Sequence, residues 1–182
     1  MANHITNLVA IDFFVVPTIN FKVLYVLVVL AHRRREVVYF NVTEHPTAQW
    51  VGQQIVEAFP WDTAPRYLLR ERDSIYGERF RRRVQSLLIK EVITAPRSPW
   101  QNPYVERIIG SIRRDCLHHV FNEGYLKRIL TRYFEYYHRW RTHLGLEMDT
   151  PHGRDVHTPD QGKVVEVPDL GGLHHHYVRL AA

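Results

Sequence analysis

The chain of 182 residues contains very little cysteine and little lysine. A single cysteine, Cys116, excludes an internal disulfide and a cysteine-ligated zinc site, and it indicates a reducing compartment. Most of the positive charge comes from arginine, whose planar guanidinium can hold two phosphate oxygens at once. With a net charge of +5, the sequence therefore predicts a polyanionic partner.

Other absences exclude whole classes of protein. The apolar run Val23–Ala31 is shorter than the ~20 residues that cross a bilayer, and the first residues lack the charged region and cleavage site of a secretory signal. There is no glycine-rich phosphate loop and no nucleophile elbow, so an enzyme acting on a small molecule is not expected. The hydrophobic content of 45% is that of a folded globular domain.

The hydrophobic pattern predicts an α/β domain. Short polar turns separate the first three apolar runs, which favours an antiparallel meander. Thr47 precedes an amphipathic segment and is expected to cap its helix. The predicted strands are 8–16, 21–31, 36–42, 66–70 and 89–94, and the predicted helices are 47–59, 78–88, a segment from Pro103, and 123–138.

The composition changes after His143, where prolines and glycines indicate loops. We expect a core domain over residues 1–150 and a linker with a short β tail over 151–182, its strands at 163–167 and 177–180. The run His174–His176 has the composition of a metal site. A loop is the favoured interpretation, because no acidic residue lies nearby in the sequence.

Three acidic residues stand at positions where structure alone does not require them. Asp12 interrupts a buried strand pattern, which costs several kcal/mol unless the carboxylate is paired or coordinated. Asp73 follows the fourth strand, at the edge where open α/β sheets bind ligands, with Glu71 as a competing acid. Glu106 lies on the flank of an apolar helical stripe.

Two of the three acids also have a purely structural explanation. Asp12 could cap a turn at the end of its strand, since Pro17 follows soon after. Glu106 could interact favourably with the dipole at the start of its helix, for which Asn102 is the expected N-cap. From the residues alone, these alternatives stay open.

Taken together, the pattern resembles the integrase core domain of DDE transposases in the retroviral integrase superfamily. The likeness is carried by V-A-I-D-F-F around Asp12, by R-Y-L-L-R-E-R before Asp73, and by S-P-W-Q-N-P-Y-V-E-R, which is similar to the P-x-x-N-x-x-x-E-R signature of bacterial insertion-sequence enzymes. The Y-Y-H-R-W-R-T-H segment resembles the one that follows in the same proteins. The match spans roughly residues 5–155.

The resemblance implies a ribonuclease-H-like mixed five-stranded sheet, an antiparallel meander followed by parallel strands, flanked by helices. It implies that Asp12, Asp73 and Glu106 are catalytic and bind Mg²⁺ or Mn²⁺, with two ions expected. The residues implied to contact DNA are Asn102, Arg107, Arg113 and Arg114. The implied activity is metal-dependent DNA cleavage and strand transfer at transposon ends and target, by a homo-oligomer in the bacterial cytoplasm, associated with the nucleoid.

Two alternatives remain at this point. A ribonuclease-H-type nuclease would use the same acids on a different substrate. A decayed or truncated copy would bind DNA through its arginines without catalysis. The second alternative is motivated by the sequence before Asp12, where the helix-turn-helix region that often precedes the core in such enzymes is not expected.

Overall fold

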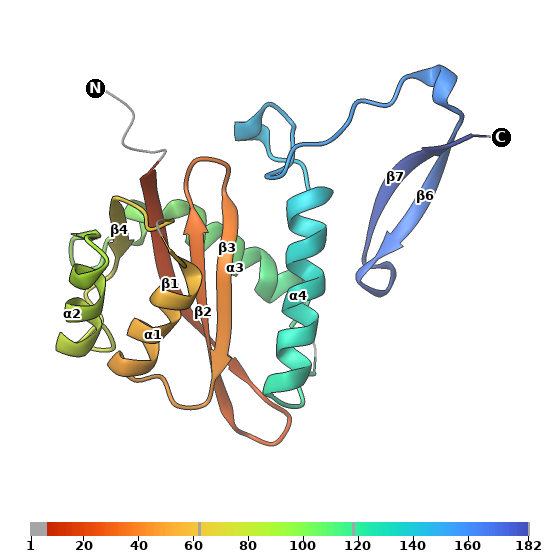
Figure 1. Cartoon of the computed structure of the whole chain (residues 1–182). Helices are drawn as coiled ribbons and strands as arrows, with labels where there is room; N and C mark the ends of the chain where they lie inside the picture. Colours follow the sequence, from red (N-terminus) through yellow and green to blue (C-terminus); the bar gives the residue numbers. More distant parts are fainter. Residues whose placement is uncertain (1–6, 62, 118, 182) are drawn as a thin grey trace. The chain divides into compact units, whose positions relative to one another are not determined.

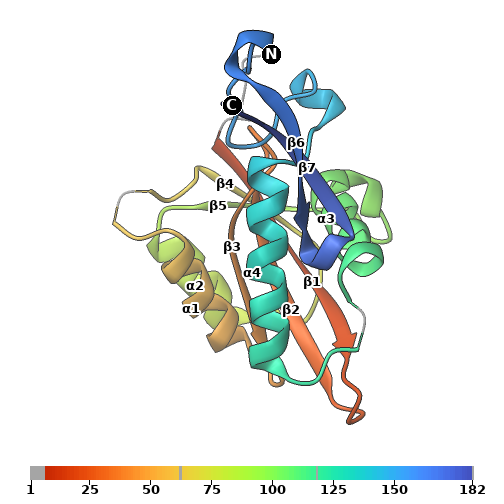
Figure 2. The same cartoon turned by 90° about the vertical axis from the view of Figure 1, so that its right-hand side faces the viewer.

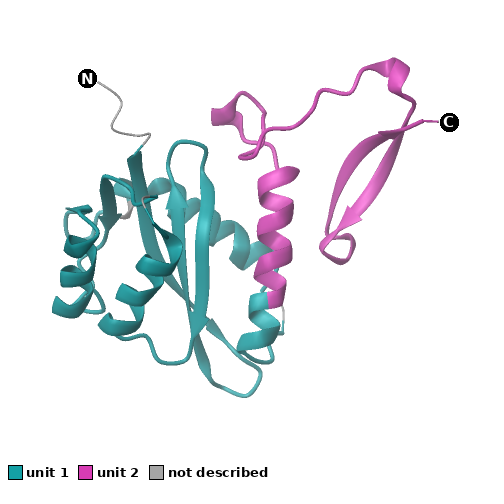
Figure 3. Cartoon of the chain, in the orientation of Figure 1, with its two compact units in different colours: residues 1–127 teal, residues 128–182 magenta. Residues whose placement is uncertain are grey.

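The computed structural model describes residues 7–61, 63–117 and 119–181. The chain divides into two compact units, Met1–Lys127 and Arg128–Ala182, and each is described by itself (Figure 3). The division falls within the helix α4 (Glu123–Arg139). The domain boundary expected at residue 150 stays a prediction.

The first unit is built on a mixed five-stranded sheet in the order β3-β2-β1-β4-β5 (Figure 1). Strands β1, β2 and β3 pair antiparallel, whereas β4 pairs parallel with β1 and with β5. The predicted fold class, a meander followed by parallel strands, is confirmed. The strands are β1 (Leu8–Pro17), β2 (Val23–Ala31), β3 (Glu36–Thr43), β4 (Tyr67–Arg70) and β5 (Lys90–Ile93).

The helices α1 (Ala48–Ala58) and α2 (Glu78–Ser86) pack on one face of this sheet (Figure 1). Their apolar side chains meet alternate residues of β1, including Ile11, in one buried core cluster. Thr47 caps α1 as predicted, because its hydroxyl accepts a hydrogen bond of 3.1 Å from the Trp50 N–H.

The helix α3 (Pro103–Asp115) covers the other face of the sheet, so that the sheet lies between α3 and the α1–α2 pair (Figure 2). Pro103 occupies its first turn, where a missing N–H costs no hydrogen bond. Its buried stripe contains Val105, Ile108, Ile109 and Ile112. Cys116 ends the helix and is buried, as its place on this stripe predicts.

The second unit contains the remainder of α4, loops, and the antiparallel hairpin of β6 (Lys163–Asp169) and β7 (His174–Leu180). Leu170, Gly171 and Gly172 have positive φ angles in its turn, a conformation that glycine adopts without steric cost. The loop predicted for the three consecutive histidines is wrong, because they begin β7. His176 Nδ1 lies 2.6 Å from Asp169 Oδ2, a neighbour that only the cross-strand register reveals.

Within the residues that the structure describes, no helix is long and apolar enough to span a bilayer.

Candidate active site

Asp12 lies where β1 runs past the end of β4. The parallel ladder between these strands covers only Leu8 to Ala10 of β1, while on the other side Asp12 stays paired with Val28 of β2. Its Oδ1 accepts a 2.8 Å hydrogen bond from the N–H of Phe13, and the residue is partly buried. The carboxylate is thus fixed to the central strand at a point where the neighbouring strand has ended.

The pKa of Asp12 is raised from 3.8 to about 7. Burial is the largest cause, because it disfavours the charged form. The carboxylates of Glu106 and Glu71 raise the pKa further by repulsion, while the Phe13 hydrogen bond and the positive charge of Arg113 lower it. Acids from three separate segments are therefore close enough to influence one another's charge.

Asp73 is exposed in the turn that follows β4. Its Oδ1 accepts hydrogen bonds from the N–H of Ile75 at 2.9 Å and from the hydroxyl of Ser74 at 3.3 Å, which hold the side chain. It lines an open cavity of about 500 Å³ together with Glu71 and Glu106. It also lines a second cavity, of about 580 Å³, with Arg113.

Glu106 reaches the first cavity from the first turn of α3, and its side chain is exposed. The loop before the helix forms the rest of the wall, from Thr94 to Ser98. A hydrogen bond of 2.8 Å from the Ala95 N–H to Gln101 Oε1 closes this loop on itself. The helix and the closed loop together fix the direction from which the Glu106 side chain enters the cavity.

The acids fit a divalent cation by their chemistry. In residues 7–61, 63–117 and 119–181, no group of three or more His, Cys, Asp or Glu side chains is already arranged around a common metal position. The donors that gather here are carboxylate oxygens, the ligands preferred by Mg²⁺ and Mn²⁺. A cation would also relieve the repulsion that raises the pKa of Asp12.

The structure places the four residues implied to contact DNA in different environments. Arg107, Arg113 and Arg114 are exposed on α3. The guanidinium of Arg113 lies 6.0 Å from the ring centre of Phe14, and its positive charge acts on the carboxylate of Asp12. Asn102 is fully buried.

Asn102 stands at the N-cap position of α3, as predicted, but its side chain makes no capping hydrogen bond. Neither its amide nitrogen nor its amide oxygen has a partner among the described residues. Its backbone carbonyl instead accepts a 3.2 Å hydrogen bond from the N–H of Glu106. The side-chain cap is therefore a wrong prediction, and the DNA contact of Asn102 stays a prediction.

Two buried residues beside the acids were missed from the sequence. Burial raises the pKa of Tyr76 well above its usual value of 10, and the charges of Asp12 and Asp73 raise it further. The guanidinium of Arg70 lies 5.2 Å from the Tyr76 ring and forms a 2.5 Å ion pair with Glu91. An arginine at the end of an apolar strand was a visible signal, whereas nothing in the sequence distinguished Tyr76.

The comparisons with known proteins agree with this architecture. Residues 87–151 match the family model of the integrase core domain, a segment that contains Glu106 and the four candidate DNA contacts but not Asp12 or Asp73. No curated protein matches the chain.

Solved structures with similar folds include two catalytic cores of viral integrases. The catalytic core domain of BIV integrase is 18% identical, with a TM-score of 0.55, over 81% of this chain and 91% of that one. The HTLV-2 integrase catalytic core domain, in complex with magnesium, is 12% identical, with a TM-score of 0.62, over 81% of this chain and 94% of that one.

Two further structures extend the comparison. A chain in the simian T-cell lymphotropic virus intasome in complex with PP2A regulatory subunit B56 gamma is 14% identical, with a TM-score of 0.65. The match covers 94% of this chain and 66% of that one, which is slightly less than two thirds of its length. The catalytic domain of Mos1 mariner transposase is 14% identical, with a TM-score of 0.58, over 72% of this chain and 71% of that one.

Two findings confirm the resemblance to the integrase core domain of DDE transposases. Residues 87–151 match the family model, and the chain shares its ribonuclease-H-like fold with integrase and transposase catalytic cores.

Proposed function

We propose that the chain is the catalytic domain of a DDE-type transposase or integrase, which cleaves DNA and joins its 3′ end to a target strand in a reaction that depends on a divalent metal. The observation that carries the proposal is that acids from separate elements lie close enough to affect the ionisation of Asp12, and that two of them line one cavity. Glu106 on α3 and Glu71 after β4 both oppose the ionisation of Asp12 on β1. Asp73 and Glu106 line one cavity.

Asp12, Asp73 and Glu106 would hold two divalent ions, Mg²⁺ or Mn²⁺. Such ions, when bound, stabilise the attacking and leaving oxygens of an in-line displacement at phosphorus. Asp12 would be the most rigidly held of the three ligands, because it is the most buried and is fixed in the central strand. The reaction class is phosphoryl transfer, with water as the nucleophile in cleavage and a 3′-hydroxyl in joining.

The arginines of α3 would hold the substrate rather than react with it. Arg113 borders the cavity that contains Asp73, and its charge already lowers the pKa of Asp12. Arg107 and Arg114 are exposed on the same helix, where their guanidinium groups can contact backbone phosphates. These contacts would direct a phosphodiester towards the acids.

The DNA partners are proposed to be transposon ends and a target duplex. Joining two ends requires more than one active site, so we propose a homo-oligomer on DNA. One of the similar structures belongs to an intasome, which is consistent with assembly on nucleic acid. A location in the bacterial cytoplasm, on the nucleoid, follows from the same proposal.

Calorimetric titration with Mn²⁺, repeated with Asp73→Ala and with the exposed control Asp155→Asn, tests the metal site. We expect the wild type and the control to bind Mn²⁺ and Asp73→Ala to lose most of the affinity, because one ligand is missing. Equal binding by all three proteins would contradict the assignment of Asp73.

Cleavage assays separate the proposed activity from its alternatives. In the presence of Mn²⁺ we expect nicking and strand transfer on duplex DNA that carries the element's own ends, and no activity in Glu106→Gln. Cleavage of an RNA–DNA hybrid in preference to the duplex would instead indicate a ribonuclease-H-type nuclease. DNA binding without cleavage of either substrate would indicate a decayed copy.

A further inference from the structure

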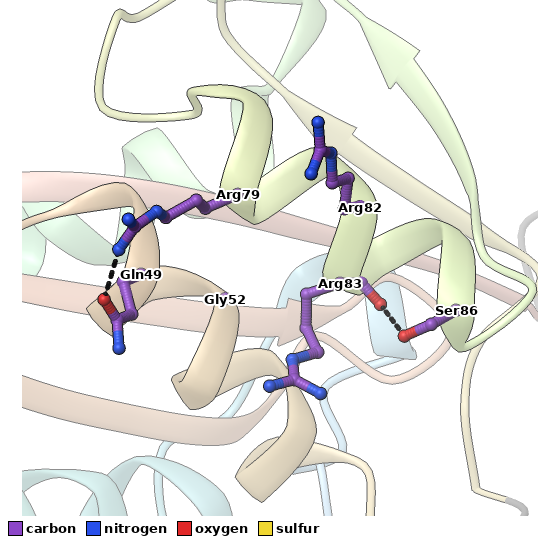
Figure 4. A pocket seen from close by; sticks show the side chains of 6 residues that line it. All are labelled: Gln49, Gly52, Arg79, Arg82, Arg83 and Ser86. Atoms are coloured by element: carbon purple, nitrogen blue, oxygen red, sulfur yellow. Dashed lines mark hydrogen bonds between the residues drawn. The ribbon is translucent and has the colours of Figure 1, made fainter.

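A second basic site lies on the face of the sheet opposite α3. The helices α1 and α2 border a groove of about 430 Å³, and none of the residues that line it is acidic (Figure 4). Its lining residues are Gln49, Gly52, Arg79, Arg82, Arg83 and Ser86. The groove shares no lining residue with either cavity of the candidate active site.

The spacing of the arginines follows from the helical period. Arg79, Arg82 and Arg83 are three and four residues apart, so they lie on one side of α2. At 1.5 Å per residue, Arg79 and Arg83 are about 6 Å apart along the helix axis. Phosphates recur about every 3.4 Å of axis along one strand of duplex DNA, so the two side chains can reach neighbouring phosphates.

Gly52 brings the two helices together at this point. A Cβ atom at Gly52 would lie 3.3 Å from the Cβ of Arg83 and 3.5 Å from the Cα of Phe80. Any larger side chain on α1 would therefore occupy the space taken by the stem of Arg83. Because Gly52 has no side chain, Arg83 has room to line the groove, while Phe80 packs in the core beneath it.

Two of the three positive charges are not neutralised within the described residues. Arg79 Nη1 donates a 2.7 Å hydrogen bond to Gln49 Oε1, a neutral group that orients the guanidinium without cancelling its charge (Figure 4). The guanidinium of Arg83 makes no hydrogen bond or ion pair with the residues that the structure describes. Only Arg82 pairs with an acid, Glu78, and both of these side chains are largely exposed.

We propose that this α1–α2 groove binds the phosphate backbone of duplex DNA, as a second contact surface that needs no metal. The guanidinium of Arg82 is directed away from that of Arg83 (Figure 4), so the cations do not converge on one small anion. They are instead spread along α2, as an extended polyanion requires. The net charge of +5 for the whole chain favours the same kind of ligand.

The test is fluorescence anisotropy with a labelled duplex of arbitrary sequence, in EDTA and over a range of KCl concentrations. Removing one phosphate contact lowers the slope of log K against log[salt] by about 0.9, which is about a fivefold loss of affinity at 0.15 M salt. We therefore expect about a fivefold loss for Arg83→Gln and about a 30-fold loss for Arg79→Gln/Arg83→Gln.

The matched control is Arg81→Gln, which removes the same charge from an exposed position of α2 outside the groove. We expect it to bind the duplex within about twofold of the wild type. Equal affinities for Arg83→Gln and Arg81→Gln, or weaker binding with an unchanged salt slope, would overturn the proposal. Because EDTA removes divalent ions, this result does not depend on whether the acids catalyse DNA cleavage.

Discussion

The charge of Asp12 is expected to destabilise the protein when no metal is bound. Because its pKa is about 7 in the folded chain and near 3.8 when unfolded, the folded state binds an extra proton between these values. The folded state therefore loses stability as the pH rises from about 4 to about 7, and the full cost is present above pH 7. The difference in pKa corresponds to about 4 kcal/mol.

The substitution Asp12→Asn removes this charge and keeps an oxygen that can accept the hydrogen bond of the Phe13 N–H. At pH 8 in EDTA we expect the variant to be more stable than the wild type by about 4 kcal/mol, or about 10 °C in Tm for a chain of this size. At pH 4 the two proteins should unfold at nearly the same temperature.

Thermal unfolding followed by circular dichroism at pH 4, 6 and 8 measures this difference, with the exposed Asp155→Asn as the control. Addition of Mg²⁺ or Mn²⁺ at pH 8 should raise the Tm of the wild type and leave that of Asp12→Asn nearly unchanged. A difference in Tm between Asp12→Asn and the wild type that is the same at every pH would refute the reasoning, because it could not arise from titration.

Three further substitutions test the fold around the site, each by urea unfolding. Glu91→Ala leaves the buried guanidinium of Arg70 without its counter-ion and should cost about 3–5 kcal/mol, whereas a cost below 1 kcal/mol would mean that the pair is already solvated. Ile55→Ala empties a fully buried position of the core and should cost about 2–5 kcal/mol; the exposed Leu88→Ala should cost far less. Thr47→Ala removes the cap of α1 and should cost about 1 kcal/mol, while Thr47→Ser should restore most of the stability.

Hydrophobic patterning was sufficient to predict the order and type of the main elements. The apolar runs around Ile11 and Val28 were long enough to indicate central strands, and turn residues separated them. Asp12 was conspicuous because it interrupts such a run. These features depend on residues close together in the chain, so they can be read without knowing the fold.

The remaining features depend on register and on packing. His176 meets Asp169 only because β6 and β7 pair as they do, so the interpretation as a loop failed. The ion pair of Arg70 with Glu91 likewise requires β4 to lie beside β5. Asn102 occupies the N-cap position that its residue type and place in the sequence predict, but the fold buries its amide without a capping hydrogen bond.

The acids of the candidate site are held by parts of the fold that differ in local stability. Asp12 belongs to the ladder between β1 and β2, whose backbone hydrogen bonds open only when the sheet unfolds cooperatively. Asp73 is held by a turn whose hydrogen bonds join residues one or two positions apart, so the turn can open while the sheet stays intact. Amide hydrogen exchange would therefore be slow around Asp12 and fast around Asp73. The position of the Asp12 carboxylate therefore depends on the global free energy of unfolding, whereas that of Asp73 depends on a local opening equilibrium.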